Sequence, residues 1–299
     1  IIKENDLNTL VVQNSNEFDL KDPEMQFRLG LIFHKGEYVE QDFKKAIYYF
    51  TLAADQNHPL AQFYVGLFYH KGEHIQRDIN RAIHYYSLAV YQNFSLAQFN
   101  LGVIYYEGIL IQRDVGKAIF YLTLASNQNN PQAQSNLGSI YYSGKYIKQD
   151  INKAIHYLSL AANQNVSLAQ HTLGFIFATG KYVKQDINKA IFYYTHAANQ
   201  NHVVSQFNLG LIYYEGSNVQ QDINKAIHYF TLAANQNDPG AQFQLGVIYS
   251  NNNYVQRDIN KAIHYYTLAA SQNDPGAQFN LGFIYSSGQY VQRDINKAI

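Results

Sequence analysis

The fold is decided by two stretches near the end of the chain, Ala241-Gln-Phe-Gln-Leu-Gly-Val-Ile-Tyr249 and Asp258-Ile-Asn-Lys-Ala-Ile-His-Tyr-Tyr266. In the first stretch the apolar residues Ala241, Leu245 and Ile248 are separated by intervals of four and three residues. The second stretch has the same kind of spacing from Ile259 onward. Such spacing predicts amphipathic α-helices. Together the two stretches therefore predict a unit of two helices joined by a short turn.

This unit occurs eight times along the chain, in steps of 36 residues without an insertion. The step is clearest at one glycine and one aspartate in each copy: Gly30, Gly66, Gly102, Gly138, Gly174, Gly210, Gly246 and Gly282, and Asp42, Asp78, Asp114, Asp150, Asp186, Asp222, Asp258 and Asp294. A fixed period of 20 to 50 residues indicates a stacked-repeat protein, in which each unit buries its core against its neighbours. We therefore predict an all-α solenoid of helix-turn-helix repeats over residues 23–299, with the eighth repeat truncated and residues 1–22 forming a divergent cap or linker.

Residues with capping preferences mark the ends of both helices. Asp238 and Asp258 each stand directly before a helix, where a side-chain oxygen can accept a hydrogen bond from a free backbone N–H. Asn273 follows the second helix, where asparagine tolerates the left-handed conformation. Most repeats carry glycine after the first helix; Asn252 takes its place in the seventh, and we expect the same left-handed conformation there.

The repeated glycine inside the first helix predicts a close helix crossing. Glycine in a helix interior costs about 1 kcal/mol relative to alanine. Its presence in all eight copies is therefore expected where another helix passes close by, and the small residues Ala262 and Ala269 are the expected partners of Gly246.

Composition excludes several classes of function. The formal net charge is zero, and lysine and arginine are spread evenly along the repeats. A nucleic-acid-binding protein usually needs a basic footprint, so no nucleic-acid partner is expected. No apolar run approaches the roughly 20 residues of a membrane-spanning helix, so membrane insertion is not expected. Cysteine is absent, which excludes disulfides and thiolate metal sites.

The repeat consensus resembles a known family. Ala-x-x-x-Leu-Gly-x-x-Tyr-x-x-Gly, then Val/Ile-x-x-Asp-x-x-Lys-Ala-x-x-Tyr, then Ala-Ala is similar to the Sel1-like repeat, a relative of the tetratricopeptide repeat. The resemblance covers roughly residues 23–299. It implies a right-handed superhelix whose first helices line a concave groove, and a role as a non-enzymatic adaptor in protein–protein interaction or signalling.

If the first helices face the groove, the residues between their buried positions are candidates for binding a peptide or helix. These candidates combine amides with aromatic and basic side chains: Arg28, His34, Tyr64, His70, Phe99, Asn100, Tyr106, Asn136, Tyr142, Asn208, Tyr214 and Asn280. Tyrosine favours interfaces because it offers a large contact area and a hydroxyl. Two other interpretations stay open: the asparagines are ordinary solvated residues of an asparagine-rich protein, and the variation from His34 to Tyr214 is surface drift.

No catalytic, cofactor or metal site is predicted. The chain lacks a nucleophile–base pair, a phosphate loop and a dinucleotide fingerprint. His84, His156, His228 and His264 share one position of the second helix, but the distance between repeats separates them too far to share an ion, and we expect them to be exposed. Two alternatives to an adaptor remain: the regulatory or targeting arm of a larger enzyme such as a kinase, and a structural spacer that associates end to end.

Overall fold

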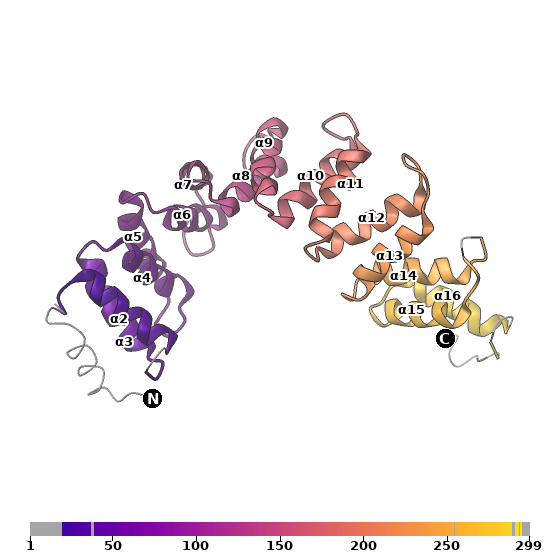
Figure 1. Ribbon diagram of the computed structural model, residues 1–299, viewed down its shortest axis with the longest axis horizontal. Helices are drawn as coiled ribbons and strands as arrows, with labels where there is room; N and C mark the ends of the chain where they lie inside the picture. Colours follow the sequence, from indigo (N-terminus) through magenta and orange to yellow (C-terminus); the bar gives the residue numbers. More distant parts are fainter. Residues whose placement is uncertain (1–19, 37–38, 254, 289–290, 293, 295–299) are drawn as a thin grey trace. The chain divides into compact units, whose positions relative to one another are not determined.

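The computed structural model describes residues 20–36, 39–253, 255–288, 291–292 and 294, which lie in two compact units, residues 1–149 and 150–299 (Figure 1). The helices of the first unit are α2 (Pro23–Lys35), α3 (Phe43–Asp55), α4 (Pro59–Lys71), α5 (Ile79–Tyr91), α6 (Ser95–Glu107), α7 (Val115–Asn127) and α8 (Pro131–Ser143). Those of the second are α9 (Ile151–Asn163), α10 (Ser167–Thr179), α11 (Ile187–Ala198), α12 (Val203–Glu215), α13 (Ile223–Ala234), α14 (Pro239–Ser250), α15 (Ile259–Ser271) and α16 (Pro275–Ser287). Within the described residues no strand occurs. The all-α prediction is confirmed, while most of residues 1–22 lies outside the described part.

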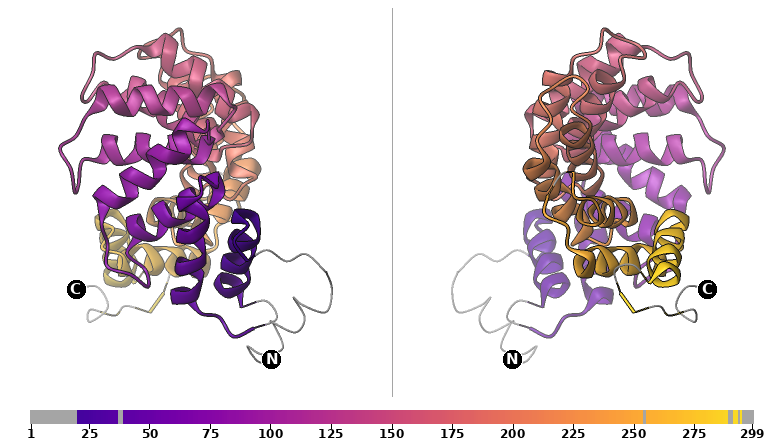
Figure 2. Two further views of the ribbon diagram at one scale, coloured as in Figure 1. Left: turned by 90° about the vertical axis from the view of Figure 1, so that its left-hand side faces the viewer. Right: turned by 90° about the vertical axis from the view of Figure 1, so that its right-hand side faces the viewer.

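In the described part of each unit, the helices form pairs, and consecutive pairs stack. Within both units, the first helix of a repeat packs against its second helix, and the second helix packs against the first helix of the next repeat. Figure 2 shows this pairing from two further sides. The chain is therefore a solenoid, as its period predicts.

The predicted caps are present. Asp258 accepts a hydrogen bond from the backbone N–H of Lys261 at 3.0 Å, and the two side chains form an ion pair at 3.5 Å. Asn273 and its equivalents all have the left-handed conformation: Asn57, Asn93, Asn129, Asn165, Asn201, Asn237 and Asn273. The expectation for Asn252 is wrong. Helix α14 ends one residue early, at Ser250, and its C-cap Asn251 is extended (φ −108°). The Asn252 side chain instead accepts a hydrogen bond from the backbone N–H of Arg257.

The close crossing at the repeated glycine is confirmed, but its expected partners are wrong. A Cβ atom placed on Gly246 would lie 2.5 Å from Cδ1 of Tyr266, a nearly fully buried residue. Ala262 and Ala269 are buried on either side of this ring along α15. The glycine therefore makes room for a large side chain of the neighbouring helix, rather than for an alanine.

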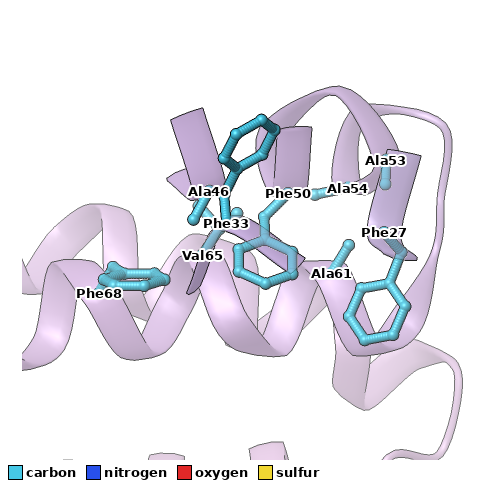
Figure 3. Close-up of a cluster of buried hydrophobic side chains, with 9 residues drawn as sticks. All are labelled: Phe27, Phe33, Ala46, Phe50, Ala53, Ala54, Ala61, Val65 and Phe68. Atoms are coloured by element: carbon cyan, nitrogen blue, oxygen red, sulfur yellow. The ribbon is translucent and has the colours of Figure 1, made fainter. Parts of the chain in front are cut away.

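The core consists of small clusters that link one repeat to the next. In the first unit, Phe50 of α3 is fully buried among Phe27 and Phe33 of α2 and Val65 and Phe68 of α4. Figure 3 shows the Phe50 ring at the centre of this cluster. Since the cluster takes residues from three successive helices, no repeat completes a core by itself.

Buried glutamines add a polar connection within the repeats. Gln62, which has no exposed surface, accepts a hydrogen bond from Nε2 of Gln92 at 2.8 Å and donates to the Ala54 carbonyl of the preceding repeat at 3.2 Å. The same glutamine pair recurs as Gln26–Gln56, Gln98–Gln128, Gln170–Gln200, Gln206–Gln236 and Gln242–Gln272. A buried polar group needs such partners to avoid a desolvation penalty. This position is therefore structural rather than a binding site.

Candidate partner-binding face

The first helices leave one face uncovered by their second helices. Residues seven apart on a helix share a face, and Leu168 and Phe175 of α10 are such a pair, 50% and 42% exposed. Val204 of α12, which stands at the same repeat position as Leu168, is 48% exposed. Leu60 and Leu96 at that position in the first unit are also exposed. We call these positions, together with the amide-bearing position between them, the free face.

The free face of the second unit is almost uncharged. Helix α10 contains no acidic residue, lysine or arginine, and α12 contains only Glu215 at its last residue. Thr172 and Asn208 are half-buried between the apolar positions. The surface therefore combines exposed aliphatic and aromatic groups with a few neutral hydrogen-bonding groups.

The asparagines predicted to bind a partner lie on this face but are half-buried: Asn100, Asn136, Asn208 and Asn280. The Asn100 side chain also interacts with the hydroxyl of Tyr86, where it lowers a pKa that burial raises. Within the described part of the chain, that buried hydroxyl has no partner with full hydrogen-bond geometry. Asn100 thus has a role in the core as well as a partly accessible amide.

Two candidates at the same repeat position have local partners. Arg28 is exposed and forms an ion pair with Glu24, one turn earlier on α2, at 2.8 Å. The Tyr64 ring stacks on Phe50 with the ring centroids 4.9 Å apart. Tyr64 therefore belongs mainly to the contact between the first two repeats, which leaves only part of its side chain for a ligand.

The candidates near the ends of the first helices are also half-buried: His34, His70, Tyr106, Tyr142 and Tyr214. Several of them contact one residue of the second helix of their own repeat. His70 lies edge-on to Tyr86 at 6.2 Å, and Tyr214 to Phe230 at 6.4 Å. Burial lowers the pKa of His70, so the neutral ring is favoured. Part of the variation at this position therefore follows from packing.

Phe99 is half-buried, and its equivalents Phe27 and Phe63 lie at the contact between repeats. The Phe63 ring is 5.3 Å from Phe94, which directly precedes α6, and the Phe27 ring stacks on His58 at 4.6 Å. This position therefore supports the stacking of the repeats more than it supplies a free surface.

The sequence reasoning selected side chains between buried positions one turn apart. It therefore did not include Leu168, Phe175 and Val204. The available signal was the apolar pair seven residues apart, seen in α4, α6, α10 and α12, because two turns of helix return to the same face.

The second helices carry four histidines at one repeat position. His84, His156, His228 and His264 are exposed, as predicted. Among the described residues, no group of three or more histidine and acidic side chains is placed to hold a metal ion. In that same part of the chain, no helix is long and apolar enough to cross a membrane.

Comparison with known proteins agrees with this geometry. A family model described as the Sel1 repeat matches residues 23–58, 59–94, 95–130, 131–166, 167–202, 203–238, 239–274 and 275–299. The chain belongs to the Sel1 repeat family. Proteins built from Sel1 repeats generally mediate protein–protein interactions and are typically non-enzymatic. None of the curated proteins matches this Sel1 repeat chain.

Two solved structures are similar to the chain. One is c5321, a protective antigen present in uropathogenic Escherichia coli strains that displays an SLR fold, with 26% identity and a TM-score of 0.90. The match covers 100% of this chain and 62% of that one, so the present chain spans less than two thirds of its relative. The other is a Sel1 repeat protein from Oxalobacter formigenes, with 27% identity, a TM-score of 0.75, and coverage of 98% and 84% of the two chains.

Proposed function

We propose that this Sel1 repeat protein is a non-enzymatic interaction scaffold that binds a peptide or helix of a partner protein on the free face of its first helices. The observation that carries the proposal is the exposed apolar group formed by Leu168, Phe175 and Val204 on α10 and α12. Apolar side chains gathered on one surface favour an interaction site, whereas single exposed ones are ordinary.

The chemistry of this face indicates the kind of partner. With no charged side chain on α10 and only Glu215 on α12, the face offers little electrostatic attraction. The partner is therefore expected to present aliphatic or aromatic side chains, with backbone or side-chain groups that can bond to Thr172 and Asn208. Its binding should depend weakly on salt, because screening acts on interactions between charges.

The spacing of the apolar positions suits a segment with regular anchors. Leu168 and Phe175 are seven residues apart, which is about 10 Å along a helix. An amphipathic helix of the partner, whose residues seven apart share a face, can therefore match the spacing along α10.

The test compares three forms of the chain in affinity capture from cells of the source organism, with captured proteins identified by mass spectrometry. The first form is unchanged, and the second carries Leu168→Ser, Phe175→Ser and Val204→Ser. The third is a matched control with Tyr48→Ser, Phe120→Ser and Phe192→Ser, which removes three apolar side chains exposed on second helices. Circular dichroism verifies that all three keep their helix content.

The proposal predicts partners that are captured by the unchanged chain and the control but lost from the free-face variant. Each lost anchor should weaken binding by about 1–2 kcal/mol, so that the triple variant binds at least about 100-fold more weakly. Partners retained by the free-face variant, or a steep loss of capture between low and physiological salt, would contradict the proposal.

A further inference from the structure

A histidine–serine–histidine network connects the fifth and sixth repeats. Nδ1 of His171 on α10 lies 3.0 Å from Oγ of Ser205 on α12, and the same Oγ lies 3.0 Å from Nδ1 of His202. The two imidazole rings stack with their centroids 4.6 Å apart. Ser205 is fully buried, and both histidines are half-buried. The network therefore lies inside the contact between two repeats.

This network is particular to one junction. Most repeats have alanine at the position of Ser205: Ala61, Ala97, Ala133, Ala169, Ala241 and Ala277. Most have phenylalanine at the position of His171: Phe27, Phe63, Phe99, Phe207, Phe243 and Phe279. Two apolar residues of the common pattern are thus replaced together by two polar residues that contact each other.

The hydrogen bonds assign the protons of the network. His202 precedes α12, and its Nδ1 accepts a hydrogen bond from the backbone N–H of Ser205 at 3.3 Å, so this nitrogen carries no proton. With both rings neutral, the Ser205 hydroxyl is placed to share the lone pair of His202 Nδ1 with the Ser205 N–H, and its oxygen is placed to accept from Nδ1–H of His171. Both rings are neutral in this arrangement, and His202 acts as the N-cap of α12.

Protonation is incompatible with this arrangement. A proton on Nδ1 of His202 removes the acceptor for the Ser205 hydroxyl and the side-chain acceptor for the Ser205 N–H, which keeps only the His202 carbonyl at 3.1 Å. A proton on Nε2 of His171 places a charge against the stacked ring of His202. The titratable groups that face His171 are His202 and the phenol of Tyr194 on α11, whose ring centroid is 5.6 Å away. Within the described residues, no carboxylate contributes to the pKa of either histidine.

We infer that the junction between the fifth and sixth repeats is a proton-sensitive switch that is closed when His171 and His202 are neutral and loosens when they are protonated. The ordered element that responds is the first turn of α12, because its cap uses Nδ1 of His202 and the His202 ring stacks on the neutral ring of His171 from α10. This inference is independent of any partner bound to the free face.

The direction and the range of pH follow from linkage. Burial, followed by the charge of His202, lowers the pKa of His171 from 6.5 to about 4, and burial also lowers the pKa of His202. The stabilisation is therefore fully present above the unfolded pKa of 6.5 and is lost as the pH falls toward 4. From His171 alone, the equilibrium for opening the junction should rise about 30-fold between about pH 7.5 and about pH 5.

The chain contains its own reference junction. His58 caps α4 through Nδ1, which accepts from the backbone N–H of Ala61 at 3.2 Å, as His202 caps α12. It stacks on Phe27 rather than on a second histidine, and its Nε2 lies 3.1 Å from a Glu24 carboxylate oxygen. This junction therefore has the same kind of cap but lacks the stacked pair of histidines and the serine between them.

The experiment measures native-state hydrogen exchange of the full chain across this range of pH, corrected for the intrinsic pH dependence of exchange. The variant carries His171→Phe and Ser205→Ala, which gives the junction the residues found at the reference junction. Protection of the Ser205 and Gln206 amides should fall about 30-fold in the unchanged chain. In the double variant, and at Ala61 and Gln62, the change should be several-fold smaller.

Equal acid responses in the unchanged chain and the double variant would overturn the inference. If the double variant does not fold, the ring signals of His171 and His202 in the unchanged chain provide a second measurement by NMR titration. Titration of both rings well below pH 6.5 supports the switch, while titration of His171 at or above pH 6.5 contradicts it.

Discussion

Gly102→Ala tests the close packing on which the repeats depend. The Cβ atom that this change adds to α6 would lie 2.6 Å from Cγ and 2.8 Å from Cδ2 of Leu122 on α7, and 3.2 Å from the Ala118 carbonyl oxygen. Favourable contacts between carbon atoms are at about 3.5–4.0 Å. Since Leu122 is fully buried, it cannot turn into solvent, and the helices must separate instead.

Two opposing effects set the change in the free energy of unfolding that Gly102→Ala should cause. Overpacking a core typically costs about 1–3 kcal/mol, and contacts this short place the change in the upper half of that range. Replacing glycine by alanine in a helix interior contributes about 1 kcal/mol in the opposite direction. The free energy of unfolding should therefore fall by about 1–2 kcal/mol.

Urea unfolding followed by circular dichroism measures this loss, and Gly116→Ala in the same repeat is the matched control. Gly116 is an exposed residue of α7, and an added Cβ would meet only a carboxylate oxygen of Asp114 at 3.4 Å. Here the helix propensity of alanine acts alone, so stability should rise by up to about 1 kcal/mol. Both substitutions replace glycine by alanine, but Gly102→Ala should lower the free energy of unfolding and Gly116→Ala should raise it.

An unfolding midpoint that Gly102→Ala leaves unchanged or raises would refute close packing of Gly102 against Leu122. A second check uses Leu122→Ala, which by itself should cost about 2–5 kcal/mol because it creates a cavity. In that background the added methyl group fills space instead of clashing, so Gly102→Ala should become neutral or stabilising. Additive effects of the two substitutions would show that the residues do not contact each other.

Three further predictions address the other structural features. Gln98→Ala should cost about 1–3 kcal/mol in urea unfolding, because the buried Gln98 accepts from Gln128 at 2.7 Å. Asp258→Asn should keep the helix cap but reduce the loss of stability below about pH 4, since the Lys261 N–H lowers the pKa of Asp258 and its contribution disappears on protonation. Ala178→Tyr should destabilise the fifth repeat in thermal unfolding by about 1–3 kcal/mol through overpacking against Tyr194, and Tyr194→Leu should relieve this cost.

Sequence alone predicted the parts of the structure that depend on local chemistry. The helix pair, the aspartate caps and the left-handed asparagines follow from spacing and capping preferences, and they appear as expected. The partner of Gly246 could not be predicted in this way, because the angle and depth of the helix crossing decide whether Ala262, Ala269 or Tyr266 meets it. The expectation for Asn252 is wrong because α14 ends one residue earlier than the other first helices. The Asn252 side chain then accepts a hydrogen bond from the backbone N–H of Arg257.

Variation among repeats has two physical origins in this chain, and they point to different surfaces. At the position of Tyr106, the variation accompanies a change in the buried residue sixteen positions later. The small residues Ala178 and Ser250 occur with Tyr194 and Tyr266, and Ser250 is 3.3 Å from the Tyr266 hydroxyl. Much of the variation at this position therefore compensates for the size of the buried residue, so that the core stays filled.

On the free face, packing explains the apolar character only in part: Leu31, Leu211 and Val247, at the position of Phe175, are partly buried against the core. Leu168, Phe175 and Val204 are about half exposed, so the packing of the repeats does not require side chains of this size there. The exposed half of each side chain adds nothing to the fold, whereas a partner that covers it gains hydrophobic burial. Variation that the core does not explain is thus the better guide to binding, and it favours the free face of α10 and α12 over the half-buried tyrosines.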